Sequence, residues 1–394
     1  MNCGSSSLKY QIINMKNEEV LAKGLAERIG SEMGRVVYEP TNGEKIVIDK
    51  PLPDHEVALR TVIDELTDKE HGVIGSLKDI DAVGHRVVHG GETLIQPVLL
   101  TKKIVDKIED IKDMAPLHNP AHVIGMRVCQ SLIKGVPEVA CFDTAFHSTI
   151  PEKAYLFGLP YEYYTDYKVR KYGFHGISHS YVSQKAAKML GKPYSRTKTI
   201  VCHLGNGASV SAVQNGKCVD TSMGFTPLDG LIMGTRSGSV DASALGYVMD
   251  KTGIDMHEMV RILNRESGMK GMTGFTDFRD IEAGMNEGNE ACKRGMEAFC
   301  YRVAKTIGSY VAAMNGVDDI VFTAGIGENS ATVRKLVCEY LGYLGVKLDA
   351  RANKKRGDAR MITTEDSVVK VFVIPTNEEL MIARETVALV KNKK

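Results

Sequence analysis

Two glycine- and serine-rich turns about two hundred residues apart have the same setting in this sequence. Gly4-Ser5-Ser6-Ser7 leads into the apolar segment Leu8–Ile13, and Gly205-Asn206-Gly207-Ala208-Ser209 leads into Val210–Val213. Small residues let a backbone approach a ligand closely, and their N–H groups and hydroxyls can converge on an anion. The sequence therefore predicts one fold unit used twice, with two turns that could clamp a polyphosphate.

The length supports the duplication, because 394 residues are too many for one hydrophobic core. No low-complexity linker marks a boundary, so the limits must come from the repeat itself. We expect a first crossing near Ser148–Pro151 and a return near Pro375-Thr376. The predicted domains are residues 1–147 together with 377–394, and residues 148–376.

Composition excludes several classes of protein. A hydrophobic content of 43% with 25% charged residues is ordinary for a globular protein, and a net charge of +1 gives no bulk attraction for nucleic acid or an anionic membrane. No segment approaches the length of a membrane span, and no signal peptide opens the chain. The eight cysteines form no CxxC pair and fall in apolar patterns, so we expect reduced core residues in a cytoplasmic protein without nucleic-acid or membrane partners.

Strand-like and helix-like segments alternate along the chain, which is typical of an α/β fold. Each strand-like run ends at a polar or glycine-rich turn, where open α/β sheets gather their ligand sites. Asn119-Pro120 is expected to open a helix, and Gly191 and Asn315-Gly316 to close two others. The predicted strands are Asp81–Val88, Glu138–Asp143, Lys198–His203, Asp319–Thr323 and Lys370–Ile374.

Five segments of the chain carry glycine-, histidine- or asparagine-rich motifs: Asn2–Lys9, Gly84–Gly91, Tyr172–Gly176, His203–Gly207 and Gly325–Asn329. Taken in order, they resemble the motifs of the acetate kinases over essentially the whole chain. The resemblance implies two duplicated actin-like ATPase (ribonuclease H-like) domains of order βββαβαβα, with a nucleotide cleft between them, and usually a homodimer.

The reaction implied is Mg²⁺-dependent phosphoryl transfer from ATP to acetate, with Mn²⁺ as an acceptable substitute for Mg²⁺. Such a transfer needs cations and donors around the moving phosphoryl group, and a guanidinium suits both carboxylate and phosphate oxygens. By resemblance, Arg86 would hold the acid, Arg236 the phosphoryl group, and His175 would donate to the same oxygens. Asp143 would orient an arginine or lie near the magnesium ion, because acetate is already ionised and hardly needs a base.

The resemblance also implies the remaining ligand contacts. Asn2 and Glu378 would lie beside magnesium, with Glu378 in a loop, whereas the neighbouring Glu379 suits the first turn of a helix. The segment Gly325–Asn329 is expected to form a glycine turn before a helix that starts at Ser330. The nucleotide contacts carried over are Ser5, Ser7, Lys9, His203, Leu204, Gly205, Asn206, Gly207, Asp277, Phe278, Arg279, Gly325, Ile326, Gly327, Glu328 and Asn329.

An apolar pocket would set the size of the acid. Its matching positions are Val88, Leu117, Phe174 and Pro227, for which plain core packing is the alternative. Propionate kinases of the same family tend to carry a smaller residue at the position of Val88, so acetate is expected as the better substrate. One methylene group is worth only about 1–3 kcal/mol, so propionate should be poorer and not excluded.

Other interpretations remain open at this point. A catalytically silent actin-like ATPase switch is possible on this fold, although the paired arginines argue against it, and a sugar kinase would need a polar pocket with a carboxylate base. The histidine pairs His85/His89, His118/His122 and His175/His179 suggest zinc, but no HExxH motif supports it, so a metal role for these pairs is disfavoured. Finally, acetate kinases usually have an apolar strand before the first turn, and here Met1 directly precedes Asn2, so we expect that strand to be missing.

Overall fold

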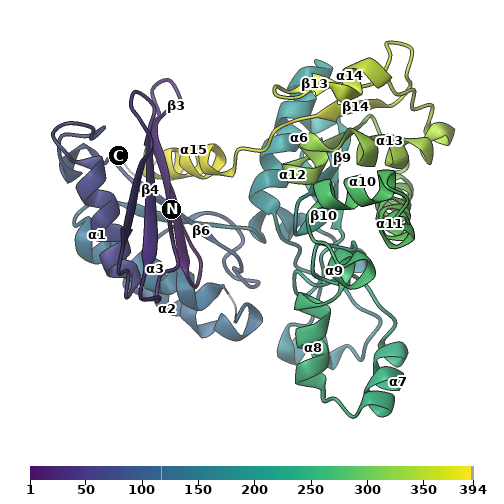
Figure 1. Cartoon of the computed structure of the whole chain (residues 1–394), viewed down its shortest axis with the longest axis horizontal. Helices are drawn as coiled ribbons and strands as arrows, with labels where there is room; N and C mark the ends of the chain where they lie inside the picture. Colours follow the sequence, from purple (N-terminus) through teal and green to yellow (C-terminus); the bar gives the residue numbers. More distant parts are fainter. Residues whose placement is uncertain (117, 392–394) are drawn as a thin grey trace. The chain divides into compact units, whose positions relative to one another are not determined.

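The computed structural model describes residues 1–116 and 118–391, and the chain divides into two compact units (Figure 1). Unit 1 comprises Met1–Ala145 and Asn377–Lys394, and unit 2 comprises Phe146–Thr376. The limits predicted from the duplication fall within two residues of these. Helices and strands alternate in both units, as expected for an α/β fold.

Unit 1 contains a five-stranded antiparallel sheet in the order β1-β2-β3-β4-β5 and a three-stranded sheet in the order β6-β8-β7, in which β6 and β8 are parallel. In the larger sheet buried and exposed residues alternate, so one face packs on helix α1. The elements are β1 (Asn2–Cys3), β2 (Ser7–Asn14), β3 (Glu19–Glu27), β4 (Gly34–Pro40), β5 (Ile46–Lys50), α1 (His55–Leu66), β6 (Val83–Val87), β7 (Val98–Leu99), α2 (Lys102–Asp110), α3 (Asn119–Leu132), β8 (Glu138–Phe142) and α15 (Glu378–Lys391).

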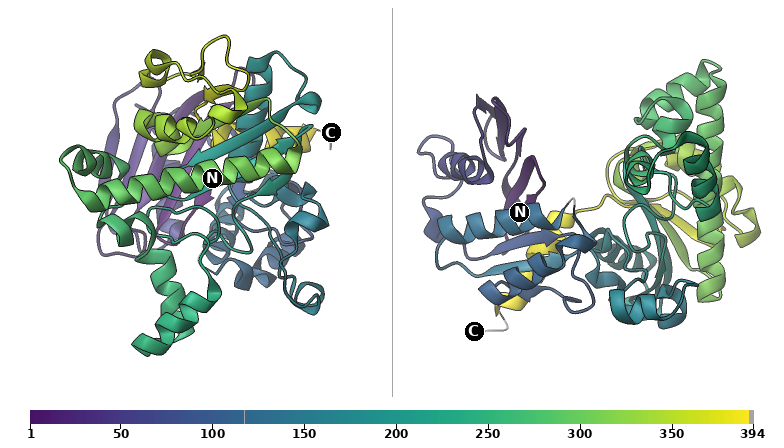
Figure 2. Two further views of the ribbon diagram at one scale, coloured as in Figure 1. Left: turned by 90° about the vertical axis from the view of Figure 1, so that its right-hand side faces the viewer. Right: turned by 90° about the horizontal axis from the view of Figure 1, so that it is seen from below.

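Unit 2 is built on a six-stranded sheet in the order β11-β10-β9-β12-β14-β13. Its central strands are buried along their whole length, because helices such as α6 and the long α11 pack against them (Figure 2). The elements are α4 (Glu152–Tyr155), α5 (Glu162–Tyr167), α6 (Gly176–Leu190), β9 (Lys198–Leu204), β10 (Ala208–Gln214), β11 (Lys217–Thr221), α7 (Ala242–Thr252), α8 (Met256–Arg265), α9 (Gly268–Thr273), α10 (Phe278–Asn286), α11 (Glu290–Met314), β12 (Asp319–Thr323), α12 (Ala324–Asn329), α13 (Ala331–Glu339), α14 (Ala350–Lys354), β13 (Arg360–Met361) and β14 (Lys370–Val373).

The two glycine-rich turns occupy equivalent places in the two units. The first joins β1 to β2, and the second joins β9 to β10, each pair being antiparallel. The first strand of the second hairpin, β9, lies between β10 and β12 and pairs with β12 in parallel. In unit 1 the corresponding contact is made by Met1, whose carbonyl accepts the Arg86 amide of β6 at 3.0 Å. The predicted duplication is therefore visible in the strand order.

The first strand, which was expected to be missing, is present as the two-residue β1. Its counterpart β9 has seven residues. The Arg86 amide, which borders this strand, has the Met1 carbonyl as its partner, so the unpaired backbone expected at this point is not found. Asn2 is held opposite Lys9 in the ladder, which fixes its position at the edge of the first turn.

Helix α15 packs on β6 because a glycine lies between them. A Cβ atom on Gly84 would lie 2.5 Å from both Ile382 Cγ2 and Thr386 Oγ1 of that helix, so only glycine permits this approach. The close contact brings the first turn of α15, with Glu378, near the end of β6, where Arg86 lies. The Gly84 position thus controls the place of two predicted site residues.

The other local predictions can be compared with the structure directly. All five predicted strands are present, and the αL residues Gly191 and Asn315 close α6 and α11 as expected. Helix α3 starts at Asn119, but His118, and not Asn119, is the residue that caps it. The eight cysteines are buried and free, and no helix in the described part of the chain is long and apolar enough to cross a membrane.

Asp319, the first residue of β12, is a buried carboxyl group that should make stability depend on pH. Oδ1 accepts a hydrogen bond from Thr199 Oγ1 at 2.9 Å, while burial, aided by Asp318, raises the pKa of Asp319 to about 7. An unfolded aspartate titrates near pH 4, so the folded state alone retains the proton between these values, and its stability falls as the pH rises from about 4 to about 7.

We therefore expect wild-type protein to lose roughly 2–3 kcal/mol of stability between pH 5 and pH 8 that an Asp319→Asn variant retains. Urea unfolding of both proteins at each pH measures the difference. The substitution itself also lowers the free energy of unfolding by an amount that is the same at every pH. This does not affect the comparison, which uses only the change in unfolding free energy with pH. Parallel pH profiles for the two proteins would show that Asp319 is ionised in the folded state.

Candidate active site

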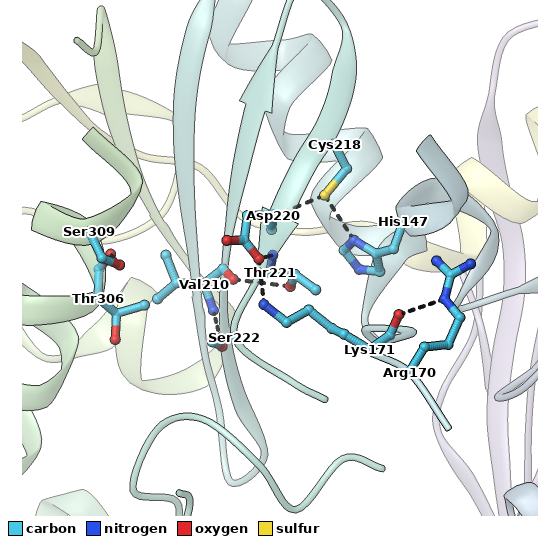
Figure 3. Close-up of polar contacts among 10 residues, drawn as sticks. All are labelled: His147, Arg170, Lys171, Val210, Cys218, Asp220, Thr221, Ser222, Thr306 and Ser309. Atoms are coloured by element: carbon cyan, nitrogen blue, oxygen red, sulfur yellow. Dashed lines mark hydrogen bonds and ion pairs between the residues drawn. The ribbon is translucent and has the colours of Figure 1, made fainter. Parts of the chain in front are cut away.

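His175 lies at the start of α6, at the end of a loop that contains two residues with a left-handed backbone. His175 has a left-handed backbone (φ 59°), and so does Gly173 (φ 75°), where a Cβ atom would lie 2.4 Å from Thr221 Cγ2. His147 Nε2 donates to the Phe174 carbonyl at 2.9 Å, and its Nδ1 lies 3.1 Å from Cys218 Sγ (Figure 3). The loop is therefore anchored on both sides of Phe174.

The segment before this loop is tied to β11. Lys171 Nζ lies 2.6 Å from Asp220 Oδ1, a half-buried ion pair that Figure 3 shows beside the Cys218–His147 contact. The Tyr172 amide also donates to the Gly224 carbonyl at 3.0 Å. These contacts hold the residues directly before the Gly-Phe-His-Gly segment against β11 and the chain that follows it.

A chain of histidine and serine side chains lies behind His175. Ser209 Oγ lies 2.9 Å from His175 Nδ1 and 2.8 Å from His179 Nε2, and Ser211 Oγ lies 2.7 Å from His179 Nδ1. Burial, together with His147 and His203, holds the pKa of His179 well below its ordinary value, so this ring is neutral. The His203 ring stacks on His175 with centroids 4.2 Å apart.

One arrangement of the protons suits donation from His175 to an anion. If Ser211 donates to His179 Nδ1, then His179 Nε2 donates to Ser209, and Ser209 donates to His175 Nδ1. A neutral His175 then carries its proton on Nε2. The reverse arrangement leaves Nε2 without a proton, so Ser209 is the residue through which the tautomer of His175 is set.

Removing the Ser209 hydroxyl should therefore lower turnover more than substrate binding. For Ser209→Ala we expect kcat to fall about tenfold, as for one lost hydrogen bond, with little change in KM. Ser211→Ala, which loses a contact to His179 but none to His175, is the matched control and should have a smaller effect. Equal losses in both variants, or a change confined to KM, would contradict this role for Ser209.

Arg236 approaches the same point as His175. A Cβ atom on Gly207 would lie 3.4 Å from Arg236 Nη1 and 3.6 Å from His175 Nε2, so both donors border the small space beside this glycine. Nη1 also donates to the Pro227 carbonyl at 3.2 Å. Burial and the nearby Arg265 lower the pKa of Arg236, and no carboxylate among the described residues forms an ion pair with it. An anion would compensate this charge.

The Gly205–Gly207 turn forms the edge of this space. The Gly205 amide donates to the Gly207 carbonyl at 3.1 Å, closing the β9–β10 hairpin, and the Asn206 carbonyl accepts from the Gly234 amide at 3.0 Å. His203 Nδ1 lies 2.8 Å from Ser178 Oγ, while Leu204 is buried in the sheet. His175, His203, the Gly205–Gly207 turn and Arg236 are thus brought together within unit 2.

The segment Gly325–Asn329 differs from the prediction. It was expected to be a glycine turn, but it lies within helix α12, which starts directly after β12. The strand passes into the helix at Ala324, which has a left-handed backbone (φ 65°), and Glu328 Oε1 accepts from the Ala324 amide at 2.9 Å. One strained residue therefore replaces the expected turn, and Gly325, Ile326, Gly327, Glu328 and Asn329 form a short helix instead.

The segment Asp277–Arg279 begins helix α10. The Asp277 side chain caps the helix by accepting from the Arg279 amide, and it also forms an ion pair with the exposed Arg279. Phe278 is buried against Phe299, with ring centroids 4.7 Å apart. Two of the three residues are thus engaged in building the helix start, and only the Arg279 side chain is fully exposed to solvent.

In unit 1, Arg86 and Asp143 form the central pair. Arg86 Nε lies 3.0 Å from Asp143 Oδ1, and Nη2 lies 2.7 Å from Oδ2, a two-bond contact across the parallel strands β6 and β8. Burial alone would lower the pKa of Arg86, but Asp143 and Glu378 raise it above its ordinary value. Asp143 is almost fully buried, whereas the Arg86 side chain remains 21% exposed.

Glu378 lies beside this pair. It was expected in a loop, but it is the first residue of α15, because the Asn377 side chain accepts from the Leu380 amide at the start of the helix. Burial raises the pKa of Glu378, Arg86 opposes that shift, and the charges of Asp143 and Glu379 add to it. Glu379 follows in the same first turn, as predicted. Three carboxyl groups therefore surround one guanidinium.

The first glycine-rich turn is also in unit 1. The Gly4 amide donates to the Ser7 carbonyl at 2.7 Å, and His55 Nε2 lies 2.8 Å from the Gly4 carbonyl oxygen. Ser5 and Lys9 are exposed, while Ser7 is half-buried. The turn therefore presents polar groups to solvent and is held from behind by helix α1.

The residues predicted to line the acid pocket are mostly buried. Val88 and Phe174 belong to the buried core of their units, and Pro227 is half-buried. Leu117 lies outside the described residues. Core packing is enough to explain why Val88 and Phe174 are buried. Either residue would limit the size of the acid only if the acid binds in contact with its side chain.

The comparisons with known proteins agree with this architecture. A crystal structure of acetate kinase from Porphyromonas gingivalis matches with a TM-score of 0.95 and 43% identity, covering 99% of this chain and 98% of that one. One titled as a propionate kinase from Francisella tularensis matches with a TM-score of 0.92 and 42% identity, over 98% of each chain. The fold is thus the duplicated α/β fold of the actin-like ATPase class.

Sequence relatives narrow the class to one family. The acetate kinase of Agathobacter rectalis is 58% identical over 99% of this chain and 98% of that protein, and the acetate kinase of Thermotoga maritima is 57% identical with the same coverage. A family model described as the acetokinase family matches residues 1–384. The chain belongs to the acetokinase family, whose members are phosphotransferases with a carboxyl group as acceptor.

Proposed function

We propose that this protein transfers the terminal phosphoryl group of ATP reversibly to acetate, giving acetyl phosphate and ADP. The relatives named acetate kinase support this reaction at up to 58% identity over nearly the whole chain. The observation that carries it most directly is the pair of donors beside Gly207, where Arg236 Nη1 and His175 Nε2 border one space and the arginine has no carboxylate partner among the described residues.

The residues divide the work as their contacts suggest. Arg236 and His175 would bind the oxygens of the transferring phosphoryl group, where negative charge is spread in the transition state. Arg86 would bind the acetate carboxylate through the exposed part of its guanidinium, while Asp143 holds its other edge. Asp143 thereby serves as a positioning residue, and no general base is needed for an acid that is already ionised.

The acidic groups near Arg86 fit a magnesium ion. Burial raises the pKa of Glu378, and the charges of Asp143 and Glu379 add to that shift, so a divalent cation would stabilise the ionised carboxylate. The carboxylate oxygens of Glu378 and the amide oxygen of Asn2 are the hard ligands that Mg²⁺ prefers and that Mn²⁺ also accepts. The ion would neutralise charge on the nucleotide phosphates.

Nucleotide contacts follow from the two hairpins and the helix after β12. Ser5, Ser7 and Lys9 in unit 1, and the His203–Gly207 turn in unit 2, offer amides, hydroxyls and a cation to phosphate. Helix α12 and the exposed Arg279 would contact the nucleoside. Because Phe278 and Asp277 are used in the fold itself, we assign them a supporting role.

Acetate, rather than propionate, is proposed as the main substrate. Val88 is buried, and a smaller side chain at this position would leave more room for an extra methylene group of the acid. The test is acyl phosphate formation with ATP and magnesium, trapped as hydroxamate, for acetate, propionate and butyrate at equal concentration. Acetate should lead by about 10-fold or more, and Val88→Ala should narrow the gap. Propionate leading in wild type would favour the alternative of a propionate kinase.

A homodimer is also proposed, as the resemblance implies. Exposed apolar side chains gather on α7 and α8, where Tyr247 is 65% exposed and Met256 is 56% exposed, a surface that a second copy could cover. Light scattering of the purified protein should give twice the chain mass, and a Tyr247→Glu variant should give a smaller value. The cytoplasmic location expected from the cysteines stays a prediction.

A further inference from the structure

A histidine, a cysteine and a glutamate from distant parts of the sequence meet inside unit 1. His85 lies in β6, Cys129 in α3 and Glu138 at the start of β8. His85 Nε2 is 2.7 Å from Glu138 Oε2, and one ligand atom from each of the three residues lies within 4.8 Å of the other two. All three side chains are buried, so the cluster is rigid and shielded from solvent.

The cluster is next to a cavity. Glu138 lines a cavity of about 390 Å³ together with residues of the β8 approach, the end of α3 and the segment after β7, among them Gln130, Ile133 and Pro137. Water in this cavity is therefore the nearest source of a fourth ligand for the cluster, whose own side chains are closed to solvent.

From this geometry we propose that His85, Cys129 and Glu138 form a binding site for a thiophilic divalent cation such as Zn²⁺. An imidazole nitrogen, a sulfur and a carboxylate oxygen, completed by water from the cavity, make the four-ligand set typical of zinc, and the sulfur excludes Mg²⁺ as the preferred ion. The site is separate from the acids around Arg86 that are proposed for magnesium.

Protons hold the cluster together when no metal is bound. Burial, reinforced by Glu138 and Cys3 and opposed by the Met1 ammonium, raises the pKa of the Cys129 thiol. Burial and the Met1 ammonium lower the pKa of His85 against the effect of Glu138, so the imidazole is neutral. On binding, Cys129 forms a sulfur–metal bond and releases its proton to solvent, and the proton on His85 moves from Nε2 to Nδ1. Affinity should therefore rise about tenfold per pH unit.

The metal would also fasten the strands that carry Arg86 and Asp143. His85 directly precedes Arg86 in β6, and Glu138 begins the strand that ends just before Asp143. Binding to the folded state alone stabilises it in proportion to the logarithm of the metal concentration over its Kd. A rise in the thermal midpoint with Zn²⁺ is the expected consequence.

The test uses Co²⁺ as a spectroscopic probe on the full chain, after chelator treatment and without nucleotide or Mg²⁺. We expect one Co²⁺ per chain with a sulfur-to-cobalt charge-transfer band, displaced by Zn²⁺. Cys129→Ser should lose the band, and Glu138→Gln should keep it while binding at least tenfold more weakly. Cys141→Ser, a buried cysteine of the same unit outside the cluster, is the matched control.

Two results would overturn the proposal. Wild-type protein that binds Co²⁺ without a sulfur band would place the ion on oxygen ligands elsewhere, and a band that persists in Cys129→Ser would assign it to another thiol. If Cys129→Ser does not fold, Glu138→Gln decides the matter, because it preserves the shape of the side chain and an unchanged affinity in that variant would exclude the cluster.

Discussion

Replacing Arg86 with lysine should lower kcat/KM for acetate by about 100- to 1,000-fold. Lysine retains the charge, but it cannot bind Asp143 through two parallel bonds and a substrate carboxylate through its remaining edge at the same time. The KM for ATP should change little, because the loss falls on the acid. Hydroxamate formation measured over a range of acetate concentrations separates the two effects.

Stability must be followed together with activity in this experiment. Arg86→Ala leaves the buried Asp143 without a partner, which should cost about 3 kcal/mol, and adding Asp143→Asn should recover much of that cost without recovering activity. Basal ATP turnover gives a further control. In Arg86→Ala a carboxylate kinase should lose acyl phosphate synthesis and affinity for the acid, whereas an ATPase switch should keep its basal ATP turnover. If ATP hydrolysis is the only activity in wild type, the ATPase switch is the better description.

Arg236→Ala should reduce kcat by about 1,000-fold or more, with the fold intact. An arginine that stabilises a transferring phosphoryl group is worth about 10³–10⁵ in rate. Because no carboxylate among the described residues pairs with Arg236, its removal leaves no buried countercharge behind, in contrast to Arg86. Arg261→Ala, which removes an exposed ion-paired arginine from the same unit, is the control and should retain nearly full activity.

Two measurements on the Arg236 variants decide the matter: the rate of phosphoryl transfer in a single turnover and the midpoint of thermal unfolding. A large loss in rate with an unchanged midpoint is expected. Arg236→Lys should recover only part of the rate. An ammonium group keeps the charge but cannot donate the two parallel hydrogen bonds that a planar guanidinium donates. A variant that unfolds at the wild-type temperature and keeps more than a tenth of the rate would remove Arg236 from the reaction.

Local patterns in the sequence predict the strands and the glycine-rich hairpins well. Gly205 and Gly207 indicate a hairpin because glycine favours tight turns of the backbone. Gly191 indicates a helix end because glycine readily adopts the left-handed conformation found there. The prediction of a turn at Gly325–Asn329 was wrong because the chain turns at Ala324 instead. No sequence pattern would indicate the left-handed backbone of this alanine. Glu378 was assigned to a loop because the capping role of Asn377 depends on a side-chain bond.

Contacts between distant segments could not be predicted in the same way. The pair His175/His179 was visible as a spacing, and it was weighed as a metal site, but Ser209, which connects the two rings, comes from another strand. Likewise, His85, Cys129 and Glu138 meet only after β6, α3 and β8 have packed. The spacing of histidines in the sequence predicts contacts within one helix or strand only. Both of these arrangements join residues of different elements and depend on the tertiary fold.

Labelling of the buried free cysteines would measure how often each unit opens transiently. Cys3, Cys129 and Cys141 are in unit 1 and the other five are in unit 2, and none can meet a thiol reagent without exposure of the core. At high reagent concentration the labelling rate equals the rate of opening, and at low concentration it reports the fraction of time that a unit is open. Mass spectrometry of the labelled peptides would therefore rank the two halves of one polypeptide by their resistance to unfolding, without denaturant.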